Sequence, residues 1–182
     1  MPPITLEPPS WRERMPSARG EVAASFALAV LTREGALWVR EGSPSMLPLI
    51  RPGDELWLAP VKPRRIYRGM LVAYERDARL IVHRVVAADR TGVVAKGDAL
   101  ALADPVVPWD RVVARVVALR RPGGRVVDFD AFPWPLLNRF LGWIASVACR
   151  LSLGAPGDAP LLPHLGWKAL RLPFYLARLF IR

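Results

Sequence analysis

Hydrophobic and polar residues alternate along much of the chain between residues 36 and 129. In segments such as RLIVHRVVAAD (79–89) and RVVARVVALRR (111–121), aliphatic residues alternate with arginine, as expected for sheet strands with one face in water. Turn-forming Gly, Pro and Asp residues separate the segments. The pattern predicts a compact, coiled, mainly β domain. The expected strands cover residues 36–42, 54–60, 70–76, 79–89, 93–98, 111–121 and 125–129.

Helical patterns lie on both sides of these strands. Residues 21–33 predict an N-terminal helix that ends at Gly35. Residues 132–154 predict a second helix, and residues 167–182 a final basic amphipathic helix that Pro173 kinks or splits. The predicted organisation is therefore a flexible lead (1–20), a β catalytic domain (21–130) and a helical basic tail (131–182).

The basic excess of the chain is concentrated in this tail. The net charge is +10, and residues 131–182 contribute half of it, with 6 basic residues against one acidic residue. A basic tail rich in Trp, Phe and Leu indicates contact with a membrane surface or a partner first, and nucleic acid only second. Packing of the tail on the β domain is the alternative interpretation, and both stay open.

No segment predicts a convincing transmembrane helix. The apolar run from Val22 to Leu31 is about half the length that a bilayer requires, and the C-terminal apolar stretch is interrupted by Arg139 and Arg150. The localisation is therefore left between the cytoplasm and the periphery of a membrane. The single cysteine, Cys149, excludes an internal disulfide and a cysteine-based metal site. No metal or cofactor is predicted.

The segment EGSPSMLPLIRPGD (41–54) carries the first candidate for chemistry. It places two serines one residue apart around Pro44, and Ser45 is the predicted nucleophile. A serine hydroxyl attacks carbonyls poorly unless a base takes its proton. Of the two histidines, His164 lies in a proline-bounded linker, whereas His83 lies in a strand of the same β domain. His83 is therefore the predicted base, although a histidine among strand aliphatics is ordinarily structural.

A histidine base needs an acid to orient its ring, and an attacked carbonyl needs donors for its oxyanion. Asp98 and Asp104 both lie in loop-prone sequence, and each is also compatible with an ordinary turn role. The residues alone leave the choice between them open. Because Pro44 has no N–H, the Ser45 N–H and the Ser43 hydroxyl are the predicted oxyanion donors.

Together these motifs resemble those of the type I signal peptidases, a superfamily that includes the self-cleaving domain of LexA-type repressors. The order and spacing are similar to the serine–histidine form of endoplasmic-reticulum and archaeal signal peptidases. The resemblance covers about 80 residues, from Arg40 to Val117. It rests on Ser45-Met46-Leu47-Pro48, Pro52-Gly53-Asp54, His83-Arg84, Lys96-Gly97-Asp98 and Asp104.

The resemblance implies a role for each matching residue. It implies Ser45 as nucleophile, Ser43 as oxyanion donor, His83 as general base and Asp104 as the orienting acid, with Asp98 supporting the site from behind. Met46 and Pro48 are implied to line or shape the substrate groove. The implied fold is a coiled β domain in which a substrate strand adds to a sheet edge, with shallow pockets for small side chains.

Three functions follow as hypotheses. The first is a serine endopeptidase that cleaves a leader or signal peptide after a small residue through a Ser45–His83–Asp104 acyl-enzyme mechanism. The second is a catalytically silent peptide-binding module on the same fold. The third is a self-cleaving, repressor-like nucleic-acid-binding protein, which the sequence favours least because no helix-turn-helix pattern precedes Ser45.

Overall fold

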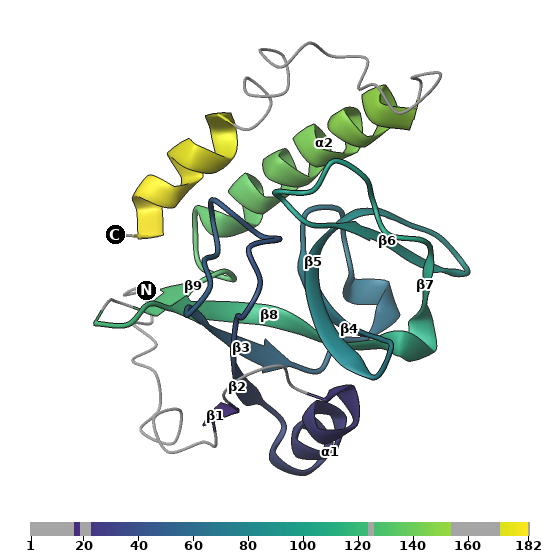
Figure 1. Cartoon of the computed structure of the whole chain (residues 1–182), viewed down its shortest axis with the longest axis vertical. Coiled ribbons are helices and arrows are strands. Elements are labelled where there is room, and N and C mark those ends of the chain that lie inside the picture. The colour runs from purple at the N-terminus through teal and green to yellow at the C-terminus, as the bar shows by residue number, and fades with distance from the viewer. Residues whose placement is uncertain (1–16, 19–22, 124–125, 154–171, 182) are drawn as a thin grey trace, which may run out of the picture.

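The computed structural model describes residues 17–18, 23–123, 126–153 and 172–181, and of residues 17–18, 151–153 and 180–181 the backbone alone (Figure 1). Within this part of the chain the protein is mainly β, as predicted. One sheet runs in the order β1-β2-β3-β8-β4-β5-β6-β7, and β9 also pairs with β8. The strands pair antiparallel except for β1, which lies parallel to β2.

The strands fall where hydrophobic alternation predicted them, with two additions. The predicted strands correspond to β2 (Leu37–Arg40), β3 (Glu55–Ala59), β4 (Leu71–Arg76), β5 (Arg79–Ala88), β6 (Gly92–Lys96), β8 (Val112–Arg120) and β9 (Val126–Asp128). The additions, β1 (Ser17–Ala18) and β7 (Val107–Pro108), are two residues long. Alternation needs four or more residues to be visible, so neither left a signal. β1 also places a short strand inside the predicted lead, whose other residues lie outside the described part.

The helix predicted over 21–33 is α1 (Ala24–Glu34). Gly35 ends it in the left-handed conformation, with φ 75°, and its N–H binds the carbonyl of Leu31. A residue with a Cβ would be strained at this φ, which is why glycine suits the end of the helix. α1 buries Ala27 and Leu31 in the main core.

The helix predicted over 132–154 is α2 (Trp134–Leu153). Of the predicted final helix, residues 172–177 are helical and are followed by the 3₁₀ turn η4 (Arg178–Ile181). Figure 1 shows these residues beside α2 and away from α1. The rest of the predicted helix, including Lys168 and Arg171, lies outside the described residues.

Part of the tail packs on the β domain. Trp134, Leu141 and Ile144 of α2, with Phe174 and Ala177, belong to the same buried cluster as residues of β2, β3 and β5. One face of each helix nevertheless remains exposed. In the described residues no helix is both long enough and apolar enough to cross a bilayer.

β5 divides two hydrophobic clusters. Alternate residues of a strand point to opposite faces of the sheet, so Val82 and Val86 join the cluster that contains α2, whereas Val85 joins a second cluster with Tyr74 of β4. His83 and Arg84 are therefore adjacent in sequence but on opposite faces. Both are almost fully buried.

Candidate active site

The loop from Glu41 to Asp54 is closed at its base by backbone hydrogen bonds. The N–H of Glu41 donates to the carbonyl of Asp54 at 2.8 Å, and the N–H of Gly53 donates to the carbonyl of Glu41 at 2.7 Å. Inside the loop, Met46, Leu49 and Ile50 are fully buried in the main core. Three buried side chains within five residues fix the backbone that carries Ser45.

The turn after β6 holds Ser45 from the other side. The N–H of Ala99 donates to the carbonyl of Ser45 at 2.8 Å. A Cβ on Gly97 would lie 2.8 Å from the same carbonyl oxygen, a distance that real Cβ contacts do not reach. The Lys96-Gly97-Asp98 motif therefore serves the position of Ser45 through its backbone, and glycine is required for that close approach.

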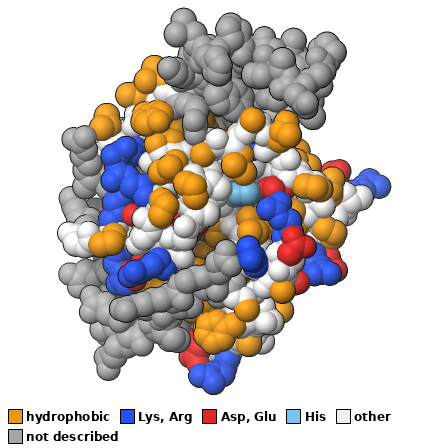
Figure 2. All heavy atoms as spheres, in the orientation of Figure 1, with side chains coloured by type: hydrophobic (Ala, Val, Ile, Leu, Met, Phe, Trp, Pro, Cys, Tyr) orange, Lys and Arg blue, Asp and Glu red, His pale blue; other side chains and the backbone are white. Residues whose placement is uncertain are grey.

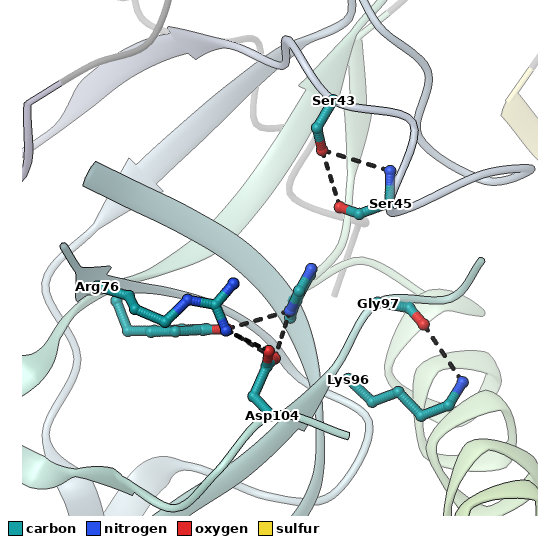
Figure 3. Close-up of polar contacts among 8 residues, drawn as sticks. Ser43, Ser45, Arg76, Lys96, Gly97 and Asp104 are labelled. Atoms are coloured by element: carbon teal, nitrogen blue, oxygen red, sulfur yellow. Dashed lines mark hydrogen bonds and ion pairs between the residues drawn. The ribbon is translucent and has the colours of Figure 1, made fainter. Parts of the chain in front are cut away.

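The side chains of Ser43 and Ser45 are hydrogen-bonded to each other (Figure 3). Their hydroxyl oxygens are 2.8 Å apart, and the N–H of Ser45 donates to the Ser43 hydroxyl at 3.3 Å. Since the Ser43 oxygen already accepts from that N–H, its own proton is available for Ser45 Oγ. The two predicted oxyanion donors, the Ser45 N–H and the Ser43 hydroxyl, thus lie together, and here the N–H donates to the hydroxyl oxygen.

Glu41 fixes the position of Ser43. Its Oε1 accepts a hydrogen bond from the Ser43 N–H at 2.8 Å, and the residue is 9 % exposed. This role could not be read from the sequence, because a glutamate at the end of a strand is common. The bond holds the turn in which Ser43 faces Ser45.

His83 is bound to Asp104. The distance from His83 Nδ1 to Asp104 Oδ2 is 2.5 Å, and the side chains are 3 % and 9 % exposed. Burial by itself would raise the pKa of the Asp104 carboxyl, but hydrogen bonds from His83, Tyr74 and Arg76 outweigh it and lower that pKa to about 2. Asp104 is therefore an ionised acceptor, so His83 Nδ1 carries the proton and Nε2 is left as the basic nitrogen.

Two further side chains hold Asp104. The Tyr74 hydroxyl donates to Oδ2 at 2.7 Å, and Arg76 Nη1 donates to Oδ1 at 2.6 Å. Burial and the neighbouring Asp104 carboxylate raise the pKa of Tyr74, so its hydroxyl stays protonated and remains a donor. Figure 3 shows Arg76 reaching the Asp104 carboxylate.

Ser45 and His83 line the same hollow, of about 360 Å³. It lies between the end of β2, the start of the loop 41–54 and the first half of β5. Its lining is apolar at Val39, Leu80, Ile81, Val82 and Leu100, and polar or charged at Arg40, Glu41, Ser43, Ser45, Arg76, Arg79 and His83. The Ser45 hydroxyl is bonded to Ser43 rather than to His83.

Asp98 lies on the opposite face of β5, paired with Arg84. Arg84 Nε and Nη2 bind the two carboxylate oxygens at 2.8 and 2.9 Å, and both side chains are fully buried. Arg84 Nη1 also donates to the Gly69 carbonyl and to Asn138 Oδ1 of α2, at 2.8 and 2.9 Å. In the described residues no hydrogen bond or ion pair joins Asp98 to His83, and Asp98 lies in the turn whose Ala99 N–H binds the Ser45 carbonyl.

Met46 and Pro48 belong to the loop 41–54 itself. Both are buried, and neither lines the hollow. Met46 belongs to the main core, and Pro48 follows a cis peptide bond. Of the two roles that the resemblance implied, lining a substrate groove is not supported by this hollow and stays a prediction. Shaping the loop from below is the role that their positions allow.

The described residues contain no group of three or more His, Cys, Asp or Glu side chains that could hold a metal ion. His164, the other histidine, lies outside the described part of the chain. The arrangement offers a serine hydroxyl, an oriented imidazole, an ionised aspartate and two donors beside the serine. No family model, curated protein or solved structure matched the chain in the comparisons with known proteins.

Proposed function

We propose that the chain is a serine endopeptidase of the type I signal peptidase kind, in which Ser45, His83 and Asp104 form the catalytic triad. One observation carries the proposal. His83 is held by Asp104 so that Nε2 is the free nitrogen, and it lines the same hollow as a serine on a rigid loop. A buried histidine with a purely structural role needs neither feature.

The proposed reaction begins when the Ser45 hydroxyl turns from Ser43 toward His83. Ser45 Oγ attacks the carbonyl carbon of the peptide bond while His83 Nε2 takes its proton, and Asp104 balances the charge on the ring. The Ser45 N–H and the Ser43 hydroxyl stabilise the oxyanion. Collapse breaks the C–N bond, and His83 gives its proton to the departing amine. Water, deprotonated by His83, then hydrolyses the ester on Ser45.

The sheet provides an edge for an extended substrate. β6 begins to pair with β5 only at Arg84. Residues 79–83 of β5 pair with β4 on one side. On their other side, the described residues contribute only the bridge between Ala23 and Arg79. A peptide that adds along this edge passes directly beside His83. The hollow of about 360 Å³, with apolar and charged lining, has room for side chains of a peptide laid along this edge. Cleavage of a leader or signal peptide after a small residue is proposed from the resemblance to the signal peptidases.

The hydrogen bond between the Ser45 and Ser43 hydroxyl groups favours the alternative, a catalytically silent peptide-binding module, because it directs the Ser45 hydroxyl to Ser43 instead of His83. Labelling with a fluorophosphonate probe, followed by mass analysis, separates the two. The peptidase should be labelled at Ser45, and Ser45→Ala should lose the label. Ser25→Ala, which changes an exposed serine of α1, is the matched control and should be labelled like the wild type.

Cleavage of a candidate precursor is the second half of the test. Ser45→Ala should lower the cleavage rate on the order of 10⁴-fold or more, because the covalent route is lost. Equal cleavage by Ser45→Ala and the wild type, or a wild type that the probe does not label, rejects the peptidase.

A further inference from the structure

The outer face of α2 exposes a row of large apolar side chains. Phe132, just before the helix, is 84 % exposed, and Leu136, Phe140 and Trp143 are 63, 49 and 55 % exposed. Residues at spacings of four and three lie on one side of a helix. We call these four residues the α2 ridge. The opposite side of α2 is buried in the core through residues such as Leu141 and Ala145, so the ridge has no cover within the described part of the protein.

A basic loop lies beside the ridge. Between β3 and β4, Lys62, Arg64, Arg65 and Arg68 are all exposed. Within the described residues none of the four forms an ion pair, whereas other exposed arginines do, such as Arg111 with Glu75. Unpaired cations clustered in seven residues create a local positive field.

The loop and the ridge form one continuous surface. Gly69, at the end of the loop, packs so closely on α2 that a Cβ there would lie 2.0 Å from the Asn138 carbonyl oxygen. The Arg139 guanidinium lies over the Tyr67 ring, 4.6 Å from its centroid. Arg139 follows Leu136 and precedes Phe140, so this contact joins the loop to the ridge itself.

A hollow lies beside the basic loop. It measures about 590 Å³, and Lys62, Arg65 and Tyr67 of the loop line it together with Arg115 and Asp130. Arg115 and Asp130 are paired with each other, which leaves Lys62 and Arg65 as the cations available to an anionic group. Asp130 is two residues before Phe132, so the hollow adjoins the end of the ridge.

We propose that the α2 ridge and the basic loop together dock on the surface of an anionic lipid bilayer. The ridge supplies aromatic and aliphatic side chains for the interfacial layer, and the loop supplies cations for phosphate headgroups. A protein interface would keep unpaired charge away from its centre, and a nucleic-acid surface would not need Leu136 and Phe140 beside its cations. The proposal stands independently of the peptidase activity.

Vesicle flotation with the full chain tests the proposal. The wild type should float with vesicles of phosphatidylcholine containing roughly one third phosphatidylglycerol, and it should bind phosphatidylcholine alone at least tenfold more weakly. Phe140→Ser with Trp143→Ser should lower the partition coefficient tenfold or more, and so should Lys62→Glu with Arg65→Glu. Leu28→Ser and Arg90→Glu, which change exposed residues outside this surface, are the matched controls and should bind like the wild type.

A second measurement does not depend on the surface variants keeping their fold. Brominated lipids should quench the tryptophan fluorescence of the wild type, and the conservative Trp143→Phe variant should lose most of that quenching. Ser45→Ala should bind vesicles like the wild type, which separates this proposal from the peptidase. Failure of the wild type to bind anionic vesicles overturns the proposal. So does binding of both surface variants as tightly as the wild type, and so does release of the wild type from the vesicles by duplex DNA.

Discussion

Two side chains on opposite faces of β5 each bind an aspartate: His83 binds Asp104, and Arg84 binds Asp98. The carboxylates of both pairs come from the segment between β6 and β7. The Arg84–Asp98 pair is saturated, because the guanidinium also binds Gly69 and Asn138, and neither side chain reaches solvent. In the His83–Asp104 pair, Nδ1 binds the carboxylate, whereas Nε2 has no hydrogen-bond partner among the described residues, and His83 lines a hollow.

The difference between the pairs shows what separates a structural ion pair from a candidate catalytic one. Burial alone does not, since both pairs are buried. The distinguishing property is a nitrogen that can accept a proton, Nε2 of His83, on a side chain that lines a hollow with space for a substrate. This comparison leads us to expect that damage to the His83 pair removes activity, whereas damage to the Arg84 pair removes stability.

The largest expected effect is that of Asp104→Asn on catalysis. The amide cannot balance a charged imidazole, and it can hold the ring in the wrong tautomer, so the cleavage rate should fall about 10⁴-fold. The measurement is kcat/KM for a cleaved precursor, with far-UV circular dichroism to confirm folding. Asp98→Asn is the matched control, and it should retain most of its activity per folded molecule. A loss below tenfold in Asp104→Asn would remove Asp104 from the triad.

Arg84→Met should produce the largest change in stability. It leaves the Asp98 carboxylate buried without a counter-ion, which costs about 3–5 kcal/mol of unfolding free energy. Urea denaturation measures the loss, and the double variant Arg84→Met with Asp98→Leu should recover most of it. If Arg84→Met unfolds with nearly the wild-type free energy, the pair is not the structural counterpart that the comparison requires.

Much of the fold could be predicted from the sequence because its strands are long and alternate clearly. β5 and β8 have ten and nine residues, enough for period two to be unmistakable. Ser45 and His83 could also be found, since a loop with two serines and two prolines is unusual and only one histidine lies in a predicted strand.

The sequence by itself could not assign the two aspartates. Asp98 and Asp104 have the same kind of local sequence, and only the opposite directions of His83 and Arg84 on β5 decide which aspartate meets which partner. Tyr74 and Arg76 were missed for a related reason. Their contacts with Asp104 span about 30 residues and depend on how β4 and β5 are aligned, which no local pattern encodes.

The smallest expected effect is on the pH dependence of stability, and it isolates the charge of Asp104. In the folded protein its pKa is about 2, against an ordinary value of 3.8, so folding favours the ionised form. The resulting stabilisation, on the order of 2 kcal/mol, is fully present above about pH 4 and is lost as the pH falls toward 2.

Asp104→Asn lacks this titration and is the natural reference for it. The difference in unfolding free energy between wild type and Asp104→Asn, measured by urea denaturation, should shrink as the pH falls from about 4 toward 2. Ionised groups that are far from Asp104 titrate alike in both proteins and cancel in the difference. A difference that stays constant to pH 2.5 would mean that His83, Tyr74 and Arg76 do not stabilise the charge of Asp104, and the contrast with the Arg84 pair would lose its electrostatic basis.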